Sequence, residues 1–326
     1  MLKNHVVSVL CAGLLVLLSS CAADCADAVR NALQLCIFSV VPSLFPFFAV
    51  SSLAVSCGLA HDLGRLCAPL MRTVFHLPGC GAAALILGFL GGYPSGVRMA
   101  SACFHAGLCS EQQAQDIACV CNNTGPAFLI GMCGGGLFGS VRIGVFLYGI
   151  HVLSALTAAY LLRPKTCPHE DTASLPAPVL SFSRALIDTV RSAGVSCLMV
   201  SAFVLFFSVI LQLLQKTAVL HTISMIAAPY FSCMGLTAQG TQSFLCGLIE
   251  LTQGLSGLTS CAGTTVARLT AVCFLCAFGG ISVLFQTAAA AQPLHISRCI
   301  GVKCLHALLA AVFCMLFLHI CPNLLH

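Results

Sequence analysis

The sequence is poor in charge. Only 7% of its 326 residues are Asp, Glu, Lys or Arg, whereas 59% are hydrophobic. Roughly a quarter of the residues in a soluble globular domain are charged, so 14 basic and 9 acidic side chains cannot cover a surface of this size. The same shortage excludes a disordered chain and a nucleic-acid-binding protein, because each needs an excess of polar or basic residues. The composition predicts a polytopic membrane protein.

Motifs that would indicate an enzyme are also missing. The chain has no HExxH motif, no phosphate-binding loop and no Ser-His-Asp pattern. Its 23 cysteines are scattered through apolar stretches, and the CxxC pair Cys273 and Cys276 has no second pair to complete a metal site. Disulfide frameworks are typical of short secreted domains, so we interpret the cysteines as small hydrophobic residues. We expect no enzyme activity, no cofactor and no metal site; a coupling ion, Na⁺ or H⁺, is left open.

Charged residues divide the chain into apolar runs that are long enough to cross a bilayer, which takes about 20 residues. We expect uninterrupted spans at His5–Ser20, Ile143–Leu162, Val195–Leu214 and Cys304–Ile320. The first belongs to a separate N-terminal helix, residues 1–22. Its end, Leu-Ser-Ser-Cys, also resembles a lipoprotein cleavage site. We favour an uncleaved helix, because the segment that follows is itself membrane protein.

Other apolar runs are interrupted in the middle. The interruptions are Pro42 and Pro46, residues 88–96, residues 122–126, and Gly279–Gly280. Lipid cannot satisfy open backbone groups, so such breaks survive at membrane depth only when they are buried in protein or line a cavity. Carriers with discontinuous helices have this pattern. We expect re-entrant hairpins and broken helices around a cavity; surface loops that join shorter helices are the alternative.

Two further segments have a distinct composition. His61–His76 has apolar residues at helical spacing with charged residues elsewhere around the helix, which predicts a helix that lies in the membrane interface. Residues 164–180 are polar and rich in proline, and they predict a linker.

The chain contains an internal duplication. Asp27, Val29, Arg30 and Ala32 recur 161 residues later as Asp188, Val190, Arg191 and Ala193. Ala68-Pro69 returns as Ala228-Pro229, and His151 returns as His306 at an offset of 155. The offset falls as a few deletions in one copy would make it fall. We predict two homologous membrane repeats, residues 23–163 and 181–326, which are either inverted or parallel. A binding site is expected where they meet near the bilayer midplane.

Glu250 is the leading candidate for a functional residue. It lies in an uncharged stretch, where an acid is costly unless it faces a cavity, is paired or stays protonated. The alternative is a structural acid that caps a helix or pairs with Arg98. Arg98 follows a glycine-rich reversal, where the N–H groups of the next helix and the guanidinium can hold an anion; a snorkelling arginine is the alternative. The predicted binding residues are Gly92, Tyr93, Pro94, Ser95, Gly96, Arg98, Asn122, Asn123, Thr124, Gly125, Glu250, Thr252, Gln253, Gly280 and Ser282.

Four motifs carry a resemblance to a known family: GFLGGYPSGVRM, CNNTGPAFLIG, GLIELTQG and FGGISVLFQ. The chain resembles the YlbJ-type sporulation integral membrane proteins, which carry the nucleoside-recognition (Gate) domain, from about Ala26 to its C-terminus. That domain is related to the core of the concentrative nucleoside transporters. The resemblance implies a carrier-like fold in the cell membrane of an endospore-forming bacterium, with the forespore membrane as one location. It also implies a role in spore maturation, with small anions such as dipicolinate as candidate cargo.

The sequence thus predicts an all-α polytopic membrane protein with two homologous repeats, re-entrant hairpins and broken transmembrane helices, preceded by one N-terminal helix. The predicted function is a secondary carrier for a small polar, anionic solute. Its expected partners are the solute and the lipid bilayer but no nucleic acid, and a homo-oligomer is left open. A non-transporting membrane scaffold and a nucleoside carrier are the alternatives.

Overall fold

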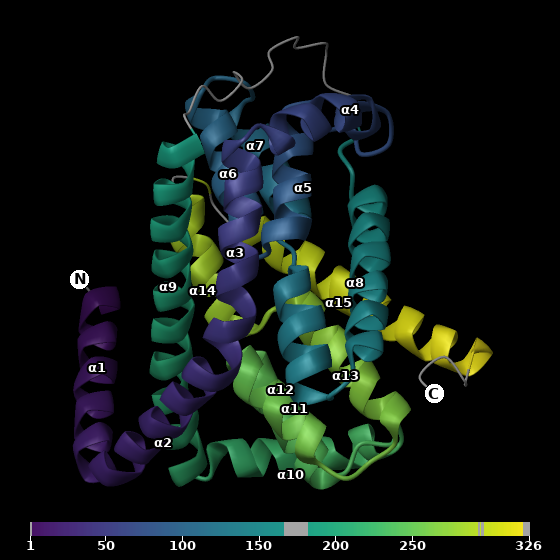
Figure 1. Ribbon diagram of the computed structural model, residues 1–326. Coiled ribbons are helices and arrows are strands. Elements are labelled where there is room, and N and C mark those ends of the chain that lie inside the picture. The colour runs from purple at the N-terminus through teal and green to yellow at the C-terminus, as the bar shows by residue number, and fades with distance from the viewer. Residues whose placement is uncertain (1, 166–181, 293, 295–296, 322–326) are drawn as a thin grey trace.

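The computed structural model describes residues 2–165, 182–292, 294 and 297–321. Within these ranges the secondary structure is helical, apart from one β-bridge between Leu236 and Gly263 (Figure 1). The all-α prediction is confirmed. The predicted linker, residues 164–180, lies almost entirely outside the described residues.

Five described segments are long and apolar enough to cross a membrane: Ala22–Val50, Val141–Leu161, Phe182–Lys216, Thr265–Ala291 and Arg298–Ile320. Three of them contain the uninterrupted spans expected around residues 143–162, 195–214 and 304–320. The first expected span is helical, as α1 (Leu2–Ser20), but it is not among the five; its apolar part is the shorter segment Cys11–Ser20.

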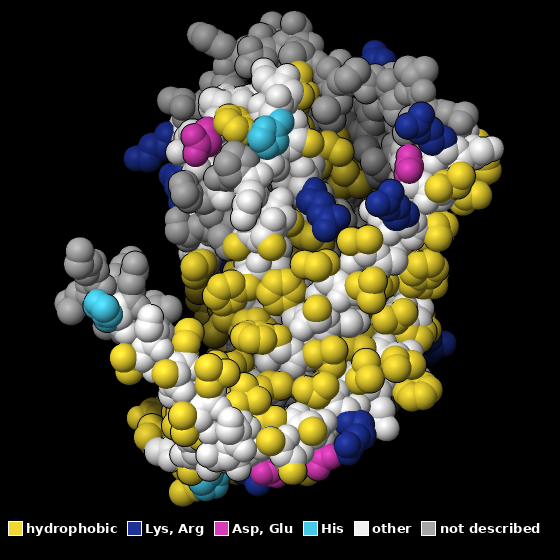
Figure 2. All heavy atoms as spheres, turned by 90° about the vertical axis from the view of Figure 1, so that its left-hand side faces the viewer, with side chains coloured by type: hydrophobic (Ala, Val, Ile, Leu, Met, Phe, Trp, Pro, Cys, Tyr) yellow, Lys and Arg dark blue, Asp and Glu magenta, His cyan; other side chains and the backbone are white. Residues whose placement is uncertain are grey.

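The surface has the distribution of side chains that lipid requires. Figure 2 shows hydrophobic side chains over the middle of one face, with most of its charged side chains toward the two ends. Many of the exposed apolar residues belong to α9 (Phe182–Lys216), including Ile187, Leu198 and Phe206, which are 68%, 72% and 57% exposed. In water such a continuous apolar belt would be a strong aggregation liability; in a bilayer it is the surface that contacts lipid.

The expected interruption at Pro42 and Pro46 is absent, so this part of the prediction is wrong. Helices α2 (Ala22–Leu35) and α3 (Val41–Ser56) are joined without a gap by the π-helical segment η1 (Cys36–Val40). Proline lacks a backbone N–H and its ring crowds the preceding turn. A π-helical turn widens the helix and changes which carbonyls are paired, and here it lies directly before Pro42. The helix therefore accommodates both prolines.

Two helices lie across opposite ends of the molecule (Figure 1): α4 (Leu59–Thr73) at the top and α10 (Val219–Ser232) at the bottom. The helix predicted at His61–His76 is therefore present as α4. On α4, Leu66 is 75% exposed; on α10, Tyr230 is 76% exposed. Each helix contains the proline of one matched Ala-Pro pair, Pro69 and Pro229.

The remaining helices follow one order twice. First come α5 (Gly81–Gly91) and α6 (Ser95–His105), then α7 (Glu111–Cys121), η2 (Ala127–Leu137) and the long α8 (Val141–Leu161). Later come α11 (Ala238–Ile249) and α12 (Leu251–Ser260), then α13 (Thr265–Phe278), α14 (Gly280–Ala291) and the long α15 (Ser297–Ile320). In each set a pair of short helices joined by a reversal precedes a helix that is interrupted.

Glycines allow both pairs of short helices to pack backbone against backbone. A Cβ added to Gly96 would lie 2.8 Å from the Cα of Gly88, and one added to Gly254 would lie 2.1 Å from the Cα of Gly247. No side chain fits at these crossings. Gly88 and Gly247 both lie near the end of the first helix of a pair, and Gly96 and Gly254 both lie in the first turn of the second.

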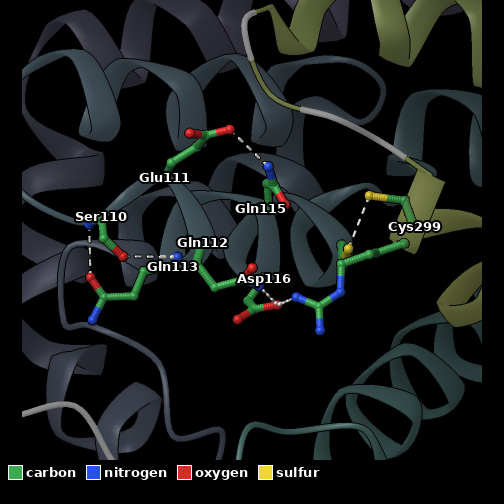
Figure 3. A network of polar contacts seen from close by, with 9 residues as sticks. Ser110, Glu111, Gln112, Gln113, Gln115, Asp116 and Cys299 are labelled. Carbon is green, nitrogen blue, oxygen red and sulfur yellow. Dashed lines mark hydrogen bonds and ion pairs between the residues drawn. The ribbon is translucent and has the colours of Figure 1, made fainter.

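Helix α7 is capped at its start and is joined to α15 farther along (Figure 3). At its start, the Ser110 hydroxyl accepts from the Gln113 N–H while the Gln113 side chain accepts from the Ser110 N–H. Farther along, Asp116 pairs with Arg298 at 3.1 Å and the Sγ of Cys119 lies 3.0 Å from that of Cys299. These contacts join α7 to the beginning of α15.

Candidate solute-binding site

Each reversal packs against the break that follows it in the chain. A Cβ added to Gly92, at the turn between α5 and α6, would lie 2.8 Å from the backbone nitrogen of Gly125. A Cβ added to Gly280, at the break between α13 and α14, would lie 2.8 Å from the carbonyl oxygen of Gly247. Gly92 and Gly280 both have positive φ, 68° and 74°, a conformation that glycine adopts without strain.

Polar contacts also join the first half of the chain to the second. They connect the α5–α6 reversal and the break between α7 and η2 to the two helices on either side of the second break, α13 and α14. The Tyr93 hydroxyl donates to the carbonyl of Cys276 at 3.0 Å, and the Thr124 Oγ1 lies 2.7 Å from the same oxygen. The Thr287 hydroxyl donates to the Asn122 Oδ1 at 3.2 Å. These residues are far apart in the sequence, so the interrupted segments come together at one place inside the protein.

A narrow cavity lies at this meeting point. Its polar wall consists of Tyr93, Thr124, Glu250, Thr252 and Gln286 together with Gly91, Gly92 and Gly125. Its apolar wall includes Leu44, Phe48, Val200, Val204 and Val283. The cavity volume is about 40 Å³, which is room for about three water molecules. The motifs Gly92–Gly96 and Glu250–Gly254, which the repeats predict to lie close together, both reach this cavity, the first through Gly92 and Tyr93 and the second through Glu250 and Thr252.

Glu250 has two roles in the geometry. It is buried, at 1% exposure, and it lines the cavity. Its carboxylate also accepts from the N–H groups of Thr252 and Gln253, at 3.1 and 2.8 Å, and so caps the start of α12. A negative group at a helix N-terminus is stabilised by the unpaired N–H groups and the helix dipole. The capping role that sequence reasoning left as an alternative is therefore present, together with exposure to the cavity.

Arg98 does not pair with Glu250, and the expectation of a shared cavity for the two charges is wrong. Arg98 is exposed, one turn into α6, and it lines a separate hollow of about 250 Å³ with Pro94, Ser196, Met199 and Phe203. The reason is helix phase. Gly96, on one face of α6, packs on Gly88, and Arg98 leaves the helix on another face. We call this space the Arg98 hollow.

The other predicted site residues surround the cavity without lining it. Asn123 donates to the carbonyl of Val120 at 2.8 Å, and Gln253 donates to the Ser208 hydroxyl. Ser282 is fully buried, and its hydroxyl has no hydrogen-bond partner among the described residues. Six of the predicted residues line the cavity: Gly92, Tyr93, Thr124, Gly125, Glu250 and Thr252. Pro94, Ser95, Gly96, Arg98, Asn122, Asn123, Gln253, Gly280 and Ser282 do not.

Sequence reasoning missed three titratable residues behind the cavity: Lys303, His151 and His306. All three are buried, at 1%, 2% and 3% exposure. His151 Nε2 accepts from the backbone N–H of Thr124 at 3.0 Å, and the two histidine rings lie 4.6 Å apart. Charged residues mark the ends of the predicted spans, so the last predicted span begins at Cys304 and leaves Lys303 outside it.

A second hollow lies beyond Glu250. It has a volume of about 460 Å³ and is lined by Asn31, Gln34, Gln212, Gln215 and Gln253, together with Ser208. We call it the amide hollow. Residues of α9 line all three spaces in turn. They are Ser196, Met199, Val200 and Phe203 at the Arg98 hollow, Val200 and Val204 at the cavity, and Ser208, Leu211, Gln212 and Gln215 at the amide hollow. The three spaces therefore follow one another along a single helix.

Two comparisons with known proteins give matches. Residues 37–163 match a family model named Gate, described as nucleoside recognition. This segment is similar to the Gate domain. It includes the first reversal, the first break and α8, and therefore five residues of the cavity's polar wall: Gly91, Gly92, Tyr93, Thr124 and Gly125. The chain is also 28% identical over 305 residues to the sporulation integral membrane protein YlbJ of Bacillus subtilis (strain 168). The aligned residues cover 85% of this chain and 73% of YlbJ. No solved structure matches.

The resemblance predicted from the sequence is confirmed by both comparisons. Together with the five apolar segments, they show a multi-pass membrane protein with a segment that matches the Gate family model. The sites of chemical interest are then the polar wall of the cavity and the buried residues directly behind it.

Proposed function

We propose that the protein is a secondary membrane carrier and that its solute is small and polar and binds in the cavity between the interrupted helices. The observation that carries this proposal is the row of three spaces along α9, with the cavity in the middle. Carriers built on discontinuous helices bind their solute near the bilayer midplane, where the helix interruptions meet. A scaffold protein has no need of polar helix ends around an internal cavity.

The length of the row supports a route across the membrane. Residues 196 to 215 of α9 cover about 28 Å at roughly 1.5 Å per residue, which is close to the roughly 30 Å hydrocarbon core of a bilayer. Thin barriers separate the spaces. Gln253, hydrogen-bonded to Ser208, stands between the cavity and the amide hollow, while Val200 and Gln286 line both the cavity and the Arg98 hollow. We infer that movement of these two barriers admits solute from opposite sides.

We further propose that the two halves are inverted repeats. The matched helices α4 and α10 lie at opposite ends of the molecule (Figure 1). The matched residues His151 and His306 are buried and in ring contact with each other, as residues near a pseudo-two-fold axis would be. The glycine crossings at Gly96 and Gly254 add a third correspondence. These observations favour inversion over parallel repeats and would make both helix pairs re-entrant hairpins.

The cavity favours a neutral solute over an anion. The anionic cargo was expected from Arg98, which lies in the Arg98 hollow. Among the residues that line the cavity, the charged one is Glu250, and an anion beside its carboxylate would be repelled. Tyr93, Thr124, Thr252 and Gln286 offer neutral donors and acceptors, which suit hydroxyl and amide groups. The nucleoside-recognition description of the Gate domain points to the same class of solute. Because the cavity has a volume of only about 40 Å³, the helices around it must separate for a nucleoside to bind.

The similarity to YlbJ, a protein named for sporulation, supports a role in spore maturation in an endospore-forming bacterium. Deletion of the gene should then lower the yield of heat-resistant spores without changing vegetative growth. Normal spore yield in the deletion strain would separate the physiological role from the transport proposal.

Thiol labelling distinguishes a carrier from a scaffold. In a background without native cysteines, Ser196→Cys, Thr252→Cys and Gln212→Cys each place one thiol in the Arg98 hollow, the cavity and the amide hollow. A membrane-impermeant reagent should modify positions 196 and 212 from opposite sides and position 252 slowly from both. Leu258→Cys, a fully buried position outside the cavity, is the control and should stay unlabelled. Equal protection of positions 252 and 258 would support the scaffold.

A further inference from the structure

Lys303 is a charged side chain without a charged partner. It lies in α15, is 1% exposed and is among the largest fully buried side chains of the described residues. No carboxylate of the described residues forms an ion pair with it. A buried ammonium without compensation is strongly unfavourable, so its surroundings must supply negative charge in another form.

The surroundings supply carbonyl and aromatic electron density. The Nζ of Lys303 donates to the carbonyl oxygen of Ala277 at 3.1 Å and to the Tyr93 hydroxyl at 3.2 Å. It also lies 4.8 Å from the centroid of the Tyr93 ring, within the range of a cation–π interaction. The other titratable groups that face it are the imidazoles of His151 and His306 and the thiols of Cys119, Cys276 and Cys299, and none of these groups is a carboxylate.

The Ala277 carbonyl belongs to the last turn of α13, which ends at Gly279 with φ of 93°. An interrupted helix leaves its final carbonyls unpaired and carries about half a negative charge at that end. The Leu275 carbonyl accepts from the Gly279 N–H at 2.7 Å, and the Cys276 carbonyl accepts from Tyr93. The Ala277 carbonyl accepts from Lys303. In carriers with discontinuous helices, helix ends of this kind coordinate the coupling cation.

We propose that the Lys303 ammonium is the resident cation of the break between α13 and α14, so that the carrier binds no Na⁺ at this site. The inference rests on the proposed carrier function and defines its ion requirement. The ammonium occupies the place where a metal cation would meet the carbonyl end of α13. It also reaches the cavity through Tyr93, whose hydroxyl contacts Lys303 and whose side chain lines the cavity wall.

The wild-type protein gives the first test. Purified in detergent, it should show no saturable binding of radioactive sodium. Its melting temperature should be the same in sodium chloride and in choline chloride at equal ionic strength. Saturable sodium binding, or a melting temperature that rises with sodium but not with choline, overturns the assignment.

Variants of Lys303 give the second test. Lys303→Ala vacates the site, and we expect its melting temperature in choline chloride to fall by about 3–8 °C, with recovery on addition of sodium or methylammonium. Lys303→Met fills the same space without charge and should be destabilised without rescue by either cation. Lys216→Met, which removes an exposed lysine paired with Asp24, controls for the substitution. Wild-type stability in Lys303→Met overturns the proposal. If Lys303→Ala does not fold, Lys303→Met and the sodium measurements on the wild type decide.

Flux measurements keep this proposal separate from the carrier function. Liposomes that contain the wild-type protein should exchange labelled uridine at the same rate with sodium or choline as the salt. Exchange that requires a sodium gradient would leave the carrier function intact and refute the proposal that Lys303 takes the place of Na⁺. Absence of exchange, together with stability that does not depend on sodium, would contradict the carrier function and leave the assignment of Lys303 intact.

Discussion

Replacement of Gly254 by alanine should separate α11 from α12. A Cβ at this position would lie 2.1 Å from the Cα and 2.3 Å from the nitrogen of Gly247, and 2.8 Å from the carbonyl oxygen of Ser243. All three atoms are backbone, so no side chain can rotate away. Relief requires the two helices to move apart by about 1 Å, which breaks the close packing of the second hairpin.

Overpacking a tight site costs about 1–3 kcal/mol, and more where the obstacle is backbone. We expect about 3 kcal/mol or more for Gly254→Ala. At roughly 2 °C per kcal/mol for a large domain, the melting temperature should fall by about 6 °C or more. Because Glu250 caps α12, the displacement also moves its carboxylate in the cavity, and solute exchange should fall with stability.

Thermal unfolding of the purified protein measures this effect against two matched variants. Gly194→Ala, in α9, meets no atom within 4 Å and should change stability by less than about 1 kcal/mol, in the stabilising direction. Gly257→Ala meets only the Ser243 side chain within 3.4 Å, 2.5 Å from its Oγ, which can rotate, and should be intermediate. A melting temperature for Gly254→Ala equal to that of Gly194→Ala would refute the packing of α11 on α12 described above.

Three further substitutions test the site. Glu250→Gln keeps the shape but loses the charge that caps α12, so the melting temperature should fall by about 1–3 °C and solute exchange by about tenfold or more. Glu111→Gln removes the same charge at the exposed start of α7 and should lower the melting temperature less and leave exchange unchanged. Tyr93→Phe removes a hydroxyl with three polar contacts and should cost about 1–3 kcal/mol, whereas Tyr230→Phe, at a position 76% exposed, should cost nothing measurable. Arg98→Ala should leave exchange of a neutral solute within about twofold, because Arg98 lies outside the cavity. A tenfold loss in that variant would make the guanidinium part of the solute-binding site.

The spans and most of the interruptions were predictable because both follow from local chemistry. A run of about 20 apolar residues marks a span, and glycine or asparagine within such a run marks a place where the helix ends. Residues 122–126 and Gly279 are interruptions in the structure for this reason. The corresponding rule for proline is wrong at Pro42, because the π-helical turn at Cys36–Val40 lets the helix continue through the proline. That turn has no marker in the sequence.

The direction of side chains was the less predictable part of the site. Arg98 and Glu250 occur in comparable motifs, yet one is exposed on α6 and the other is buried at the start of α12. The phase of a short helix after a tight reversal decides this, and it depends on how the glycines pack. Lys303 shows a second limit. Its partners, Ala277 and Tyr93, are 26 and 210 residues away in the chain, so no local pattern shows that its charge is satisfied inside the membrane.

Solute exchange in liposomes tests the carrier directly. Liposomes that contain purified wild-type protein and unlabelled uridine should accumulate labelled uridine transiently and saturably. The same liposomes loaded with dipicolinate, a small anion, should show little exchange of that anion. Thr252→Val, which removes a buried hydroxyl from the cavity wall with nearly unchanged shape, should reduce uridine exchange while the protein stays folded, with a loss of stability no larger than that of Tyr93→Phe. Folded wild-type protein that exchanges neither probe above empty liposomes would contradict the carrier for both classes of solute and favour a membrane scaffold.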